Sequence, residues 1–318
     1  MNKSIISQLK NSPRTDTIVD VQDVTQGKEM SQLIQMRRRI KAIETIKKIT
    51  SAMRLISRSL HTRLHKQQVI LKEYRNITCA IFSELHQAAP LWTSELFAPN
   101  PSEPKHELVI IIGGQKGLCG NFNSNIFYWI DTHQDDLKNF TKKSIVMGRR
   151  VEEHFTKRKL PFVASYEELK AQNLDAMTDK IIDHIISQNP RYTSVQIISN
   201  HSKTFFIHEQ KTTQLIPFTW CAPDQGANSL STDYVWEHDK EELLKVLATS
   251  YLKTTVKMTL FESLLGEQSA RFISMDNATR NAKNFLESMR LGYNKARQAK
   301  ITKELTELSG AFESDSLV

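Results

Sequence analysis

A seven-residue apolar repeat near the C-terminal end constrains the fold of this 318-residue chain more than any other feature. The repeat lies within residues 239–311, a stretch that contains no proline and three glycines. All but three of its sixteen positions are apolar. In order they are Leu244, Leu247, Tyr251, Thr254, Met258, Phe261, Leu265, Gln268, Phe272, Met275, Thr279, Ala282, Leu286, Met289, Tyr293 and Ala296. This pattern predicts one helix on the order of 100 Å long, which needs a partner along its whole length.

The predicted partner helix lies near the other end of the chain, where residues 28–89 contain neither glycine nor proline. Its apolar row comprises Ile46, Ile49, Met53, Ile56, Leu60, Ile70, Tyr74, Ile77, Ile81 and Leu85. The row is interrupted at Arg63 and Gln67. Two such helices favour an antiparallel coiled coil with a domain inserted between them. The alternative is two separate amphipathic helices packed on a globular core.

Between the two helices, apolar runs alternate with helical patterns. The predicted strands cover residues 108–112, 144–147, 162–166, 194–198 and 205–207, the last running on towards Ile216. Helices are predicted from about Ser124, over 149–159 and over 176–188. This alternation predicts an α/β domain with a mainly parallel sheet and an antiparallel edge. We therefore divide the chain into a flexible extension (1–29), a first helix (30–89), an α/β domain (90–238) and a last helix with a tail (239–318). The extension could also be an over-long start, with Met30 as the true first residue.

The net charge of +8 is concentrated in the first helix. Residues 30–66 contain ten basic side chains and one acidic side chain, Glu44. A solvated helix face normally mixes both signs, so this imbalance favours contact with an external acidic surface. A nucleic acid is the alternative partner, but the helix lacks interleaved aromatic residues and contains no recognisable binding module. No run of eighteen apolar residues is present, which argues against a membrane-spanning segment.

The residues that could carry chemistry form no recognisable active site. The glycine-rich segment 113–120 follows a predicted strand, but it lacks the Gly-Lys-Ser/Thr ending of a phosphate-binding loop and the GxGxxG pattern. We interpret it as a tight turn. Cys119 has no histidine partner in the sequence, so a small buried residue is the favoured interpretation. Three cysteines without CxxC spacing predict neither a disulfide framework nor a zinc site. We predict no catalytic residue, metal site or cofactor.

Several segments resemble the gamma subunit of F-type ATP synthase, and together they cover roughly residues 30–311. The first helix carries the family's N-terminal signature at residues 39–40 and 45–53. The family's central motif resembles Gly117, Leu118, Cys119 and Gly120, followed by Asn125. The C-terminal signature matches at residues 267–271, 277–279 and 293–307, and the last of these segments is the most specific.

This resemblance implies a fold of two terminal helices wound together around an inserted Rossmann-like α/β domain. It also implies a function as the central-stalk rotor, without catalysis of its own. The rotor would turn inside a ring of three alpha and three beta subunits and couple proton flow to ATP synthesis or hydrolysis on beta. Met53 and Arg271 match positions near an acidic lever of beta. Positions that match the catch between rotor and ring are Gln298, Thr302, Glu304 and Glu307.

The resemblance further implies epsilon and the ring of c subunits as partners of the middle domain, with one copy of the chain per complex. The expected location is the cytoplasmic side of a bacterial membrane, peripheral through the complex, with no nucleic-acid partner. Two other functions stay open on the residues alone. One is an independent α/β enzyme with helical arms, and the other is a coiled-coil protein that binds nucleic acid.

Overall fold

The computed structural model describes residues 19–88, 92, 104–139, 141–166, 169–188, 190–218 and 239–315. The two longest elements are the helices α1 (Val19–Ala88) and α6 (Lys240–Asp315). The chain divides into two compact units, and both helices run through both of them. Unit 1 comprises Met1–Thr50 and Ala278–Val318, and unit 2 comprises Ser51–Asn277. Within the described helices, no segment is long and apolar enough to cross a membrane.

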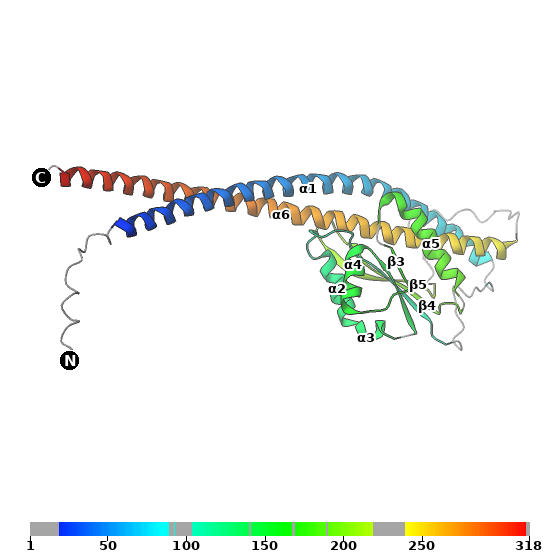
Figure 1. Ribbon diagram of the computed structural model, residues 1–318. Coiled ribbons are helices and arrows are strands. Elements are labelled where there is room, and N and C mark those ends of the chain that lie inside the picture. Colours follow the sequence, from blue (N-terminus) through cyan, green and yellow to red (C-terminus); the bar gives the residue numbers. More distant parts are fainter. Residues whose placement is uncertain are drawn as a thin grey trace, which may run out of the picture. The chain divides into compact units, whose positions relative to one another are not determined.

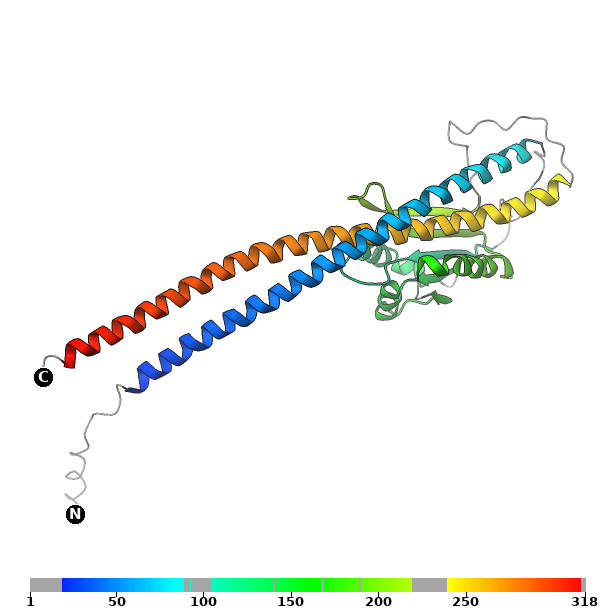
Figure 2. The ribbon, with the colours of Figure 1, turned by 90° about the horizontal axis from the view of Figure 1, so that it is seen from above.

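Unit 1 is an antiparallel pair formed by the first part of α1 and the last part of α6 (Figure 2). The hydroxyl of Thr279 donates to the hydroxyl of Thr50 at 2.9 Å, and Arg290 pairs with Glu44. On α6 the shielded side chains follow the predicted repeat and are Thr279, Ala282, Leu286, Met289, Tyr293 and Ala296. On α1 they are Leu33, Met36, Ile40, Ile43, Lys47 and Thr50. Alternating steps of three and four residues on both helices confirm the predicted coiled-coil seam of the last helix.

The start of α1 differs from the sequence-based prediction. We expected an extension through residue 29, but α1 begins at Val19 and continues through Gly27. A single glycine inside a helix costs only about 1 kcal/mol relative to alanine, so it does not by itself end the helix. Residues 1–18 lie outside the described part of the chain.

In unit 2, α1 packs through a different row of side chains from the one we predicted. The shielded row repeats every seven residues and consists of Ser57, Leu64, Leu71, Thr78 and Leu85. Half of the predicted apolar row in unit 2 is instead exposed, including Ile56 at 58%, Ile70 at 70% and Ile77 at 50%. At these three positions the shielded residue is the next one along the chain, which corresponds to a rotation of the helix by about 100°. Leu85 belongs to both rows. The small side chains of Ser57 and Thr78 fit in a closely packed seam, and apolarity alone could not identify them.

A five-stranded sheet forms the centre of unit 2, with the strand order β3-β2-β1-β4-β5. The strands are β1 (Glu107–Ile112), β2 (Lys142–Met147), β3 (Ala164–Tyr166), β4 (Ser194–Ser202) and β5 (His208–Ile216). The first four pair in parallel, and β5 pairs antiparallel to β4. This arrangement confirms the predicted sheet. The strand predicted from residue 205 towards Ile216 is confirmed as β5, but its predicted start is wrong. Residues 203–207 form a turn in which Ile207 N–H donates to the Thr204 hydroxyl at 3.2 Å.

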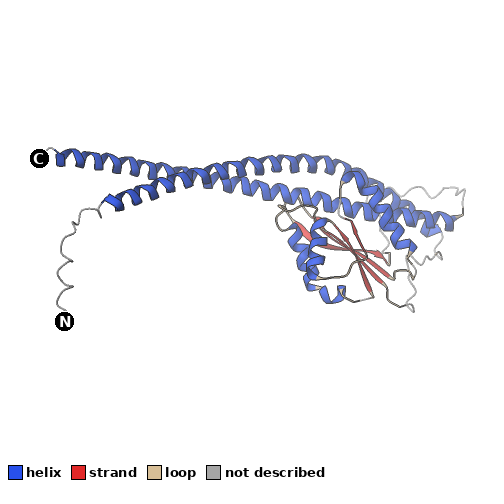
Figure 3. Ribbon diagram, viewed as in Figure 1, coloured by secondary structure: helices blue, strands red, loops and turns tan. Residues whose placement is uncertain are grey.

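Helices cover both faces of the sheet (Figure 3). On one face, α2 (Phe122–Thr132) and α4 (Arg149–Arg158) pack through Ile126, Ile130 and Phe155 against Val109 and Ile111. On the other face lie α5 (Leu174–Ser187) and the adjoining part of α6. Side chains of α5 and α6 in that core include Ile181, Ile185, Leu260 and Leu264. The short helices α3 (Gln134–Leu137) and η1 (Ala171–Asn173) were not predicted. The expected α/β domain between two terminal helices is confirmed (Figure 1).

Candidate functional site

The central motif lies on the glycine-rich turn that joins β1 to α2. Gly113 N–H donates to the Met147 carbonyl at 2.9 Å, and Gly114 N–H donates to Asn123 Oδ1 at 2.8 Å. A side chain at Gly113 would collide with Val151, and Gly148 crosses close to the Gly113 carbonyl with φ at 91°. Glycine is required at both positions, because only glycine allows this approach of backbone to helix and backbone to backbone.

The carboxylate of Glu267, on α6, lies against this turn, and the corresponding turn of a nucleotide-binding fold is the one that holds a phosphate. Its carboxylate accepts hydrogen bonds from the backbone N–H groups of Gln115 at 3.2 Å and Lys116 at 3.3 Å. Arg271, one helical turn further along α6, pairs with the same carboxylate. Both side chains are nearly completely buried, at 3% exposure for Glu267 and 6% for Arg271. The two N–H donors of the turn are therefore already used by an anion that belongs to the chain itself.

The rest of the motif is divided between a buried thiol and an exposed leucine. Cys119 is buried, and its sulfur accepts a hydrogen bond from Asn123 Nδ2 at 3.1 Å. Burial, and then the nearby Glu267 carboxylate, raise the pKa of the Cys119 thiol, so it stays protonated and a poor nucleophile. This agrees with the interpretation of Cys119 as a small buried residue. Leu118 has φ at 62° and is 61% exposed, an unusual backbone conformation for a leucine.

The structure separates the residues predicted to contact partner subunits into two groups. Arg271 is enclosed within unit 2, and Met53 lies half-buried on α1. In unit 1, all four catch positions on α6 are exposed, namely Gln298, Thr302, Glu304 and Glu307. Three apolar side chains of the same stretch are also exposed, Ile301 at 47%, Leu305 at 62% and Leu308 at 57%. Direct contact of any of these residues with another subunit stays a prediction.

The basic side chains of residues 30–66 are mostly without acidic partners. Arg54 is paired, with Nη1 at 2.7 Å from Asp276 Oδ1. The others have no ion-pair partner within the described residues. In unit 1 these are Arg37, Arg38, Arg39, Lys41, Lys47 and Lys48, and in unit 2 they are Arg58, Arg63 and Lys66. The one acid of the stretch, Glu44, pairs with Arg290 of α6 instead.

Sequence reasoning assigned no separate role to Glu267, and it grouped Arg54 with the cations expected to face an external acidic surface and to contribute little to folding. The ion pair of Arg54 with Asp276 corrects that expectation. Glu267 stands in one of the segments that resemble the gamma subunit, yet its partners lie about 150 positions away in the chain. Arg54 is one of ten cations within residues 30–66, and only the fold shows that it is the one paired with Asp276. One signal in the sequence could have identified Glu267. It is an acidic residue placed four positions before an arginine, on a helix that packs beside the glycine-rich turn.

Comparisons with known proteins agree with this architecture. A family model described as ATP synthase matches residues 32–314. The ATP synthase gamma chain of Chlorobium chlorochromatii is 30% identical over 293 residues, which are 90% of this chain and 99% of that relative. The gamma chain of Clostridium perfringens is 28% identical over 289 residues, which are 89% of this chain and 98% of the relative.

Two solved structures share the fold. A chain in the central stalk and c-ring of the Tetrahymena thermophila mitochondrial ATP synthase has a TM-score of 0.53 at 20% identity and covers 72% of this chain and 99% of its own length. A chain of the Euglena gracilis mitochondrial ATP synthase has a TM-score of 0.51 at 16% identity. The match covers 83% of this chain and 95% of the Euglena chain. The fold is that of a central-stalk subunit. The chain belongs to the gamma-chain family of ATP synthase. The resemblance seen in the sequence motifs is thereby confirmed, together with the rotor function of this family.

Proposed function

We propose that this chain is the non-catalytic rotor of a bacterial ATP synthase, in which the paired helices of unit 1 turn inside a ring of three alpha and three beta subunits. ATP is made or hydrolysed on beta, and proton flow through the c-ring drives the rotation. The middle domain contacts epsilon and the c-ring. The complex holds one copy of the chain at the cytoplasmic face of the membrane.

The observation that carries this proposal is the surface of α1. In unit 1, six cations that have no acidic partner among the described residues lie on a helix that also exposes Ile46 at 50% and Ile49 at 54%. A rod that stayed in water would gain from pairing its cations with neighbouring acids and from shielding its isoleucines. Both features are explained if acidic and apolar surfaces of other subunits surround the rod.

Lack of symmetry is what lets such a rod act on catalytic sites. Two different helices, one strongly basic and one of mixed charge, cannot make the same contacts with three equivalent beta subunits at once. At each angle the rod stabilises a different conformation of each subunit, and it must be turned to change that pattern. Rotation and nucleotide affinity are then linked by the difference in contact free energy between the angles.

Non-catalytic action is supported by the closed turn in unit 2. The N–H groups that could hold a phosphate donate to Glu267, and the thiol of Cys119 is protonated and buried. We expect the purified chain to hydrolyse no ATP and to bind none in titration calorimetry. It should co-purify with the alpha and beta chains of the same organism and stimulate their ATPase activity. Micromolar ATP binding by the chain alone, or failure to join alpha and beta, would overturn the proposal.

A charge-removal experiment tests the surface of α1 directly. Lys41→Gln together with Lys48→Gln removes two exposed cations in unit 1, whereas Lys157→Gln together with Lys180→Gln removes two exposed cations in the middle domain. Exposed charges contribute little to stability, so the free energy of unfolding should change by less than about 0.5 kcal/mol in both double variants. ATP-driven proton pumping by the assembled complex should fall only in the first. If proton pumping falls equally in both double variants, the overall charge of the chain is responsible and not the surface of α1.

A further inference from the structure

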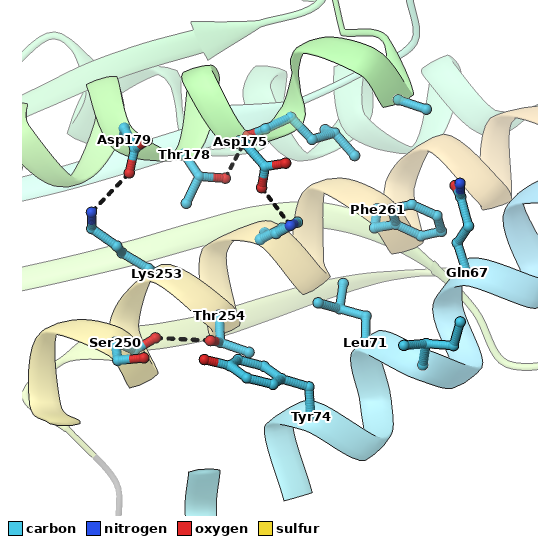
Figure 4. Close-up of a pocket in the computed structure, with 14 residues that line it drawn as sticks. Gln67, Leu71, Tyr74, Asp175, Thr178, Asp179, Ser250, Lys253, Thr254 and Phe261 are labelled. Atoms are coloured by element: carbon cyan, nitrogen blue, oxygen red, sulfur yellow. Dashed lines mark hydrogen bonds and ion pairs between the residues drawn. The ribbon is translucent and has the colours of Figure 1, made fainter. Parts of the chain in front are cut away.

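Three helices of unit 2 line a cavity that is open to solvent on one side and that no contact described above uses. It lies between α1, α5 and α6 and has a volume of about 600 Å³ (Figure 4). Pockets for small molecules typically have volumes of roughly 300–1,000 Å³. The cavity is therefore large enough to hold an organic molecule with one or two rings.

One wall of the cavity consists of two ion pairs that connect α6 to α5. Lys253 Nζ lies 2.8 Å from Asp179 Oδ1, and Lys257 pairs with Asp175 one helical turn away (Figure 4). Each lysine thus has its own aspartate, and the charged groups of the lining cancel. A charged ligand would have to compete with one of these pairs, whereas a neutral ligand leaves both intact.

The opposite wall and the floor are apolar and aromatic. Leu71 of α1 points towards Phe261 of α6, and the ring of Tyr74 lies further along the cavity beside Thr254 (Figure 4). Tyr74 is 53% exposed, so part of its ring lies uncovered at the edge of the cavity. Aromatic side chains favour contact with another ring, either offset-stacked or edge-to-face.

Hydrogen-bonding groups are present at two further points of the lining. The hydroxyls of Thr254 and Thr178 donate to carbonyls of their own helices, at 2.8 Å to Ser250 and 2.7 Å to Leu174. Their oxygens therefore remain available as acceptors for a ligand. Gln67 of α1 supplies an amide at the rim, which can both donate and accept.

We propose that this cavity binds a neutral, mainly apolar small molecule that carries an aromatic ring and one or two hydroxyl, amine or carbonyl groups. The ring packs against the exposed ring of Tyr74 and the side chain of Leu71, and the polar groups meet the threonine oxygens and Gln67. Because the three walls belong to three helices, a bound molecule ties α1 to α5 and α6 and stabilises the folded chain. The proposal does not depend on the rotor function.

The test uses the neutral fluorescent probe N-phenyl-1-naphthylamine with the purified full-length chain. Two variants fill the cavity from opposite sides, Ser250→Trp from α6 and Gln67→Trp from α1. Their matched controls place the same ring on exposed positions of the same helices outside the cavity, Val246→Trp and Lys72→Trp. Circular dichroism checks that each variant is folded, and the exposed position of Gln67 keeps one filling variant usable if Ser250→Trp disturbs the helix.

We expect saturable binding of one probe per chain, with at least about tenfold weaker binding in both filling variants and unchanged binding in both controls. An anionic naphthalene sulfonate of the same size should bind more weakly than the neutral probe. Probe fluorescence that does not saturate, or that persists unchanged in the folded filling variants, would overturn the proposal. Stronger binding of the sulfonate would contradict the neutral character of the ligand.

Discussion

Arg54 of α1 and Asp276 of α6 form an ion pair, with 2.7 Å between Nη1 and Oδ1, that holds the two helices together in unit 2. Both side chains are partly shielded, at 32% and 18% exposure. This distinguishes Arg54 from its basic neighbours on α1, which have no ion-pair partner among the described residues. The same stretch of sequence thus contains a cation that stabilises the chain and cations that are free to act outside it.

Breaking this pair should cost measurable stability. Arg54→Gln and Asp276→Asn are each expected to lower the free energy of unfolding by about 1 kcal/mol, since the partly solvated pair is screened. The double variant should lose less than the sum of the two, because the first change already removes the interaction. Urea denaturation of the four proteins measures this coupling. Arg58→Gln, on the same helix and without an ion-pair partner in the described residues, is the control and should change stability by less than about 0.5 kcal/mol.

The buried pair of Glu267 and Arg271 predicts a larger effect. Glu267→Gln keeps one oxygen acceptor but leaves the Arg271 guanidinium buried without a counter-charge, which should cost about 3–5 kcal/mol. Adding Arg271→Met removes that charge and should restore part of the loss. Thermal unfolding followed by circular dichroism compares the variants. If the double variant is less stable than Glu267→Gln alone, the ion pair with Arg271 is not the reason why Glu267 stabilises the chain.

The strands and the last helix could be predicted because their signals are local. The apolar run that became β1 and the seven-residue repeat of α6 each lie within one continuous segment. The seam of α1 could not be predicted, because its shielded row includes Ser57 and Thr78 while Ile56 and Ile70 face outwards. A pattern of apolar residues does not by itself show which side of a helix is shielded. The prediction therefore failed where the polar residues Ser57 and Thr78 take inner positions.

The position of Met53 allows a test of the predicted lever contact. Met53 is half-buried, so the stem of a lysine there can lie along the helix and place its ammonium in water. Met53→Lys should lower the free energy of unfolding by only about 1 kcal/mol. In the assembled complex, we expect ATP hydrolysis to persist while proton pumping falls, because the added cation binds an acidic beta segment too tightly at one angle.

Met53→Gln is the matched control, since it adds polarity without charge and should leave pumping intact. Equal loss of pumping in both variants would assign the effect to packing of the helix. Failure of Met53→Lys to assemble would show that the side chain belongs to the core of the chain.

Two histidines of unit 2, His61 and His208, predict how stability depends on pH. Burial, and then His65 and His208, lower the pKa of His61, while burial lowers the pKa of His208. The folded chain therefore favours the neutral rings. The neutral rings contribute to stability at pH values above the pKa of histidine in the unfolded chain, which is about 6.5. This contribution is lost as the pH falls through the lower pKa values that the two rings have in the folded chain.

The ring of His61 packs edge-on against Phe205, with 4.9 Å between the ring centroids, so the turn between β4 and β5 should loosen first on acidification. Hydrogen exchange of residues 203–207 measured between pH 7.5 and 5 should report this opening. In His61→Gln, the stability of the chain should depend less steeply on pH over the same range. An unchanged pH dependence would show that other groups control it.

Glu267 has a consequence for how the middle domain responds to its surroundings. A nucleotide bound at such a turn would come and go with its concentration in the cell, and the turn would change conformation with occupancy. A carboxylate carried on α6 is present at an effective concentration set by the fold and cannot diffuse away. The backbone N–H groups of Gln115 and Lys116 therefore keep an anionic partner for as long as the chain is folded. Because that partner belongs to α6, the conformation of the turn is tied to the position of this helix.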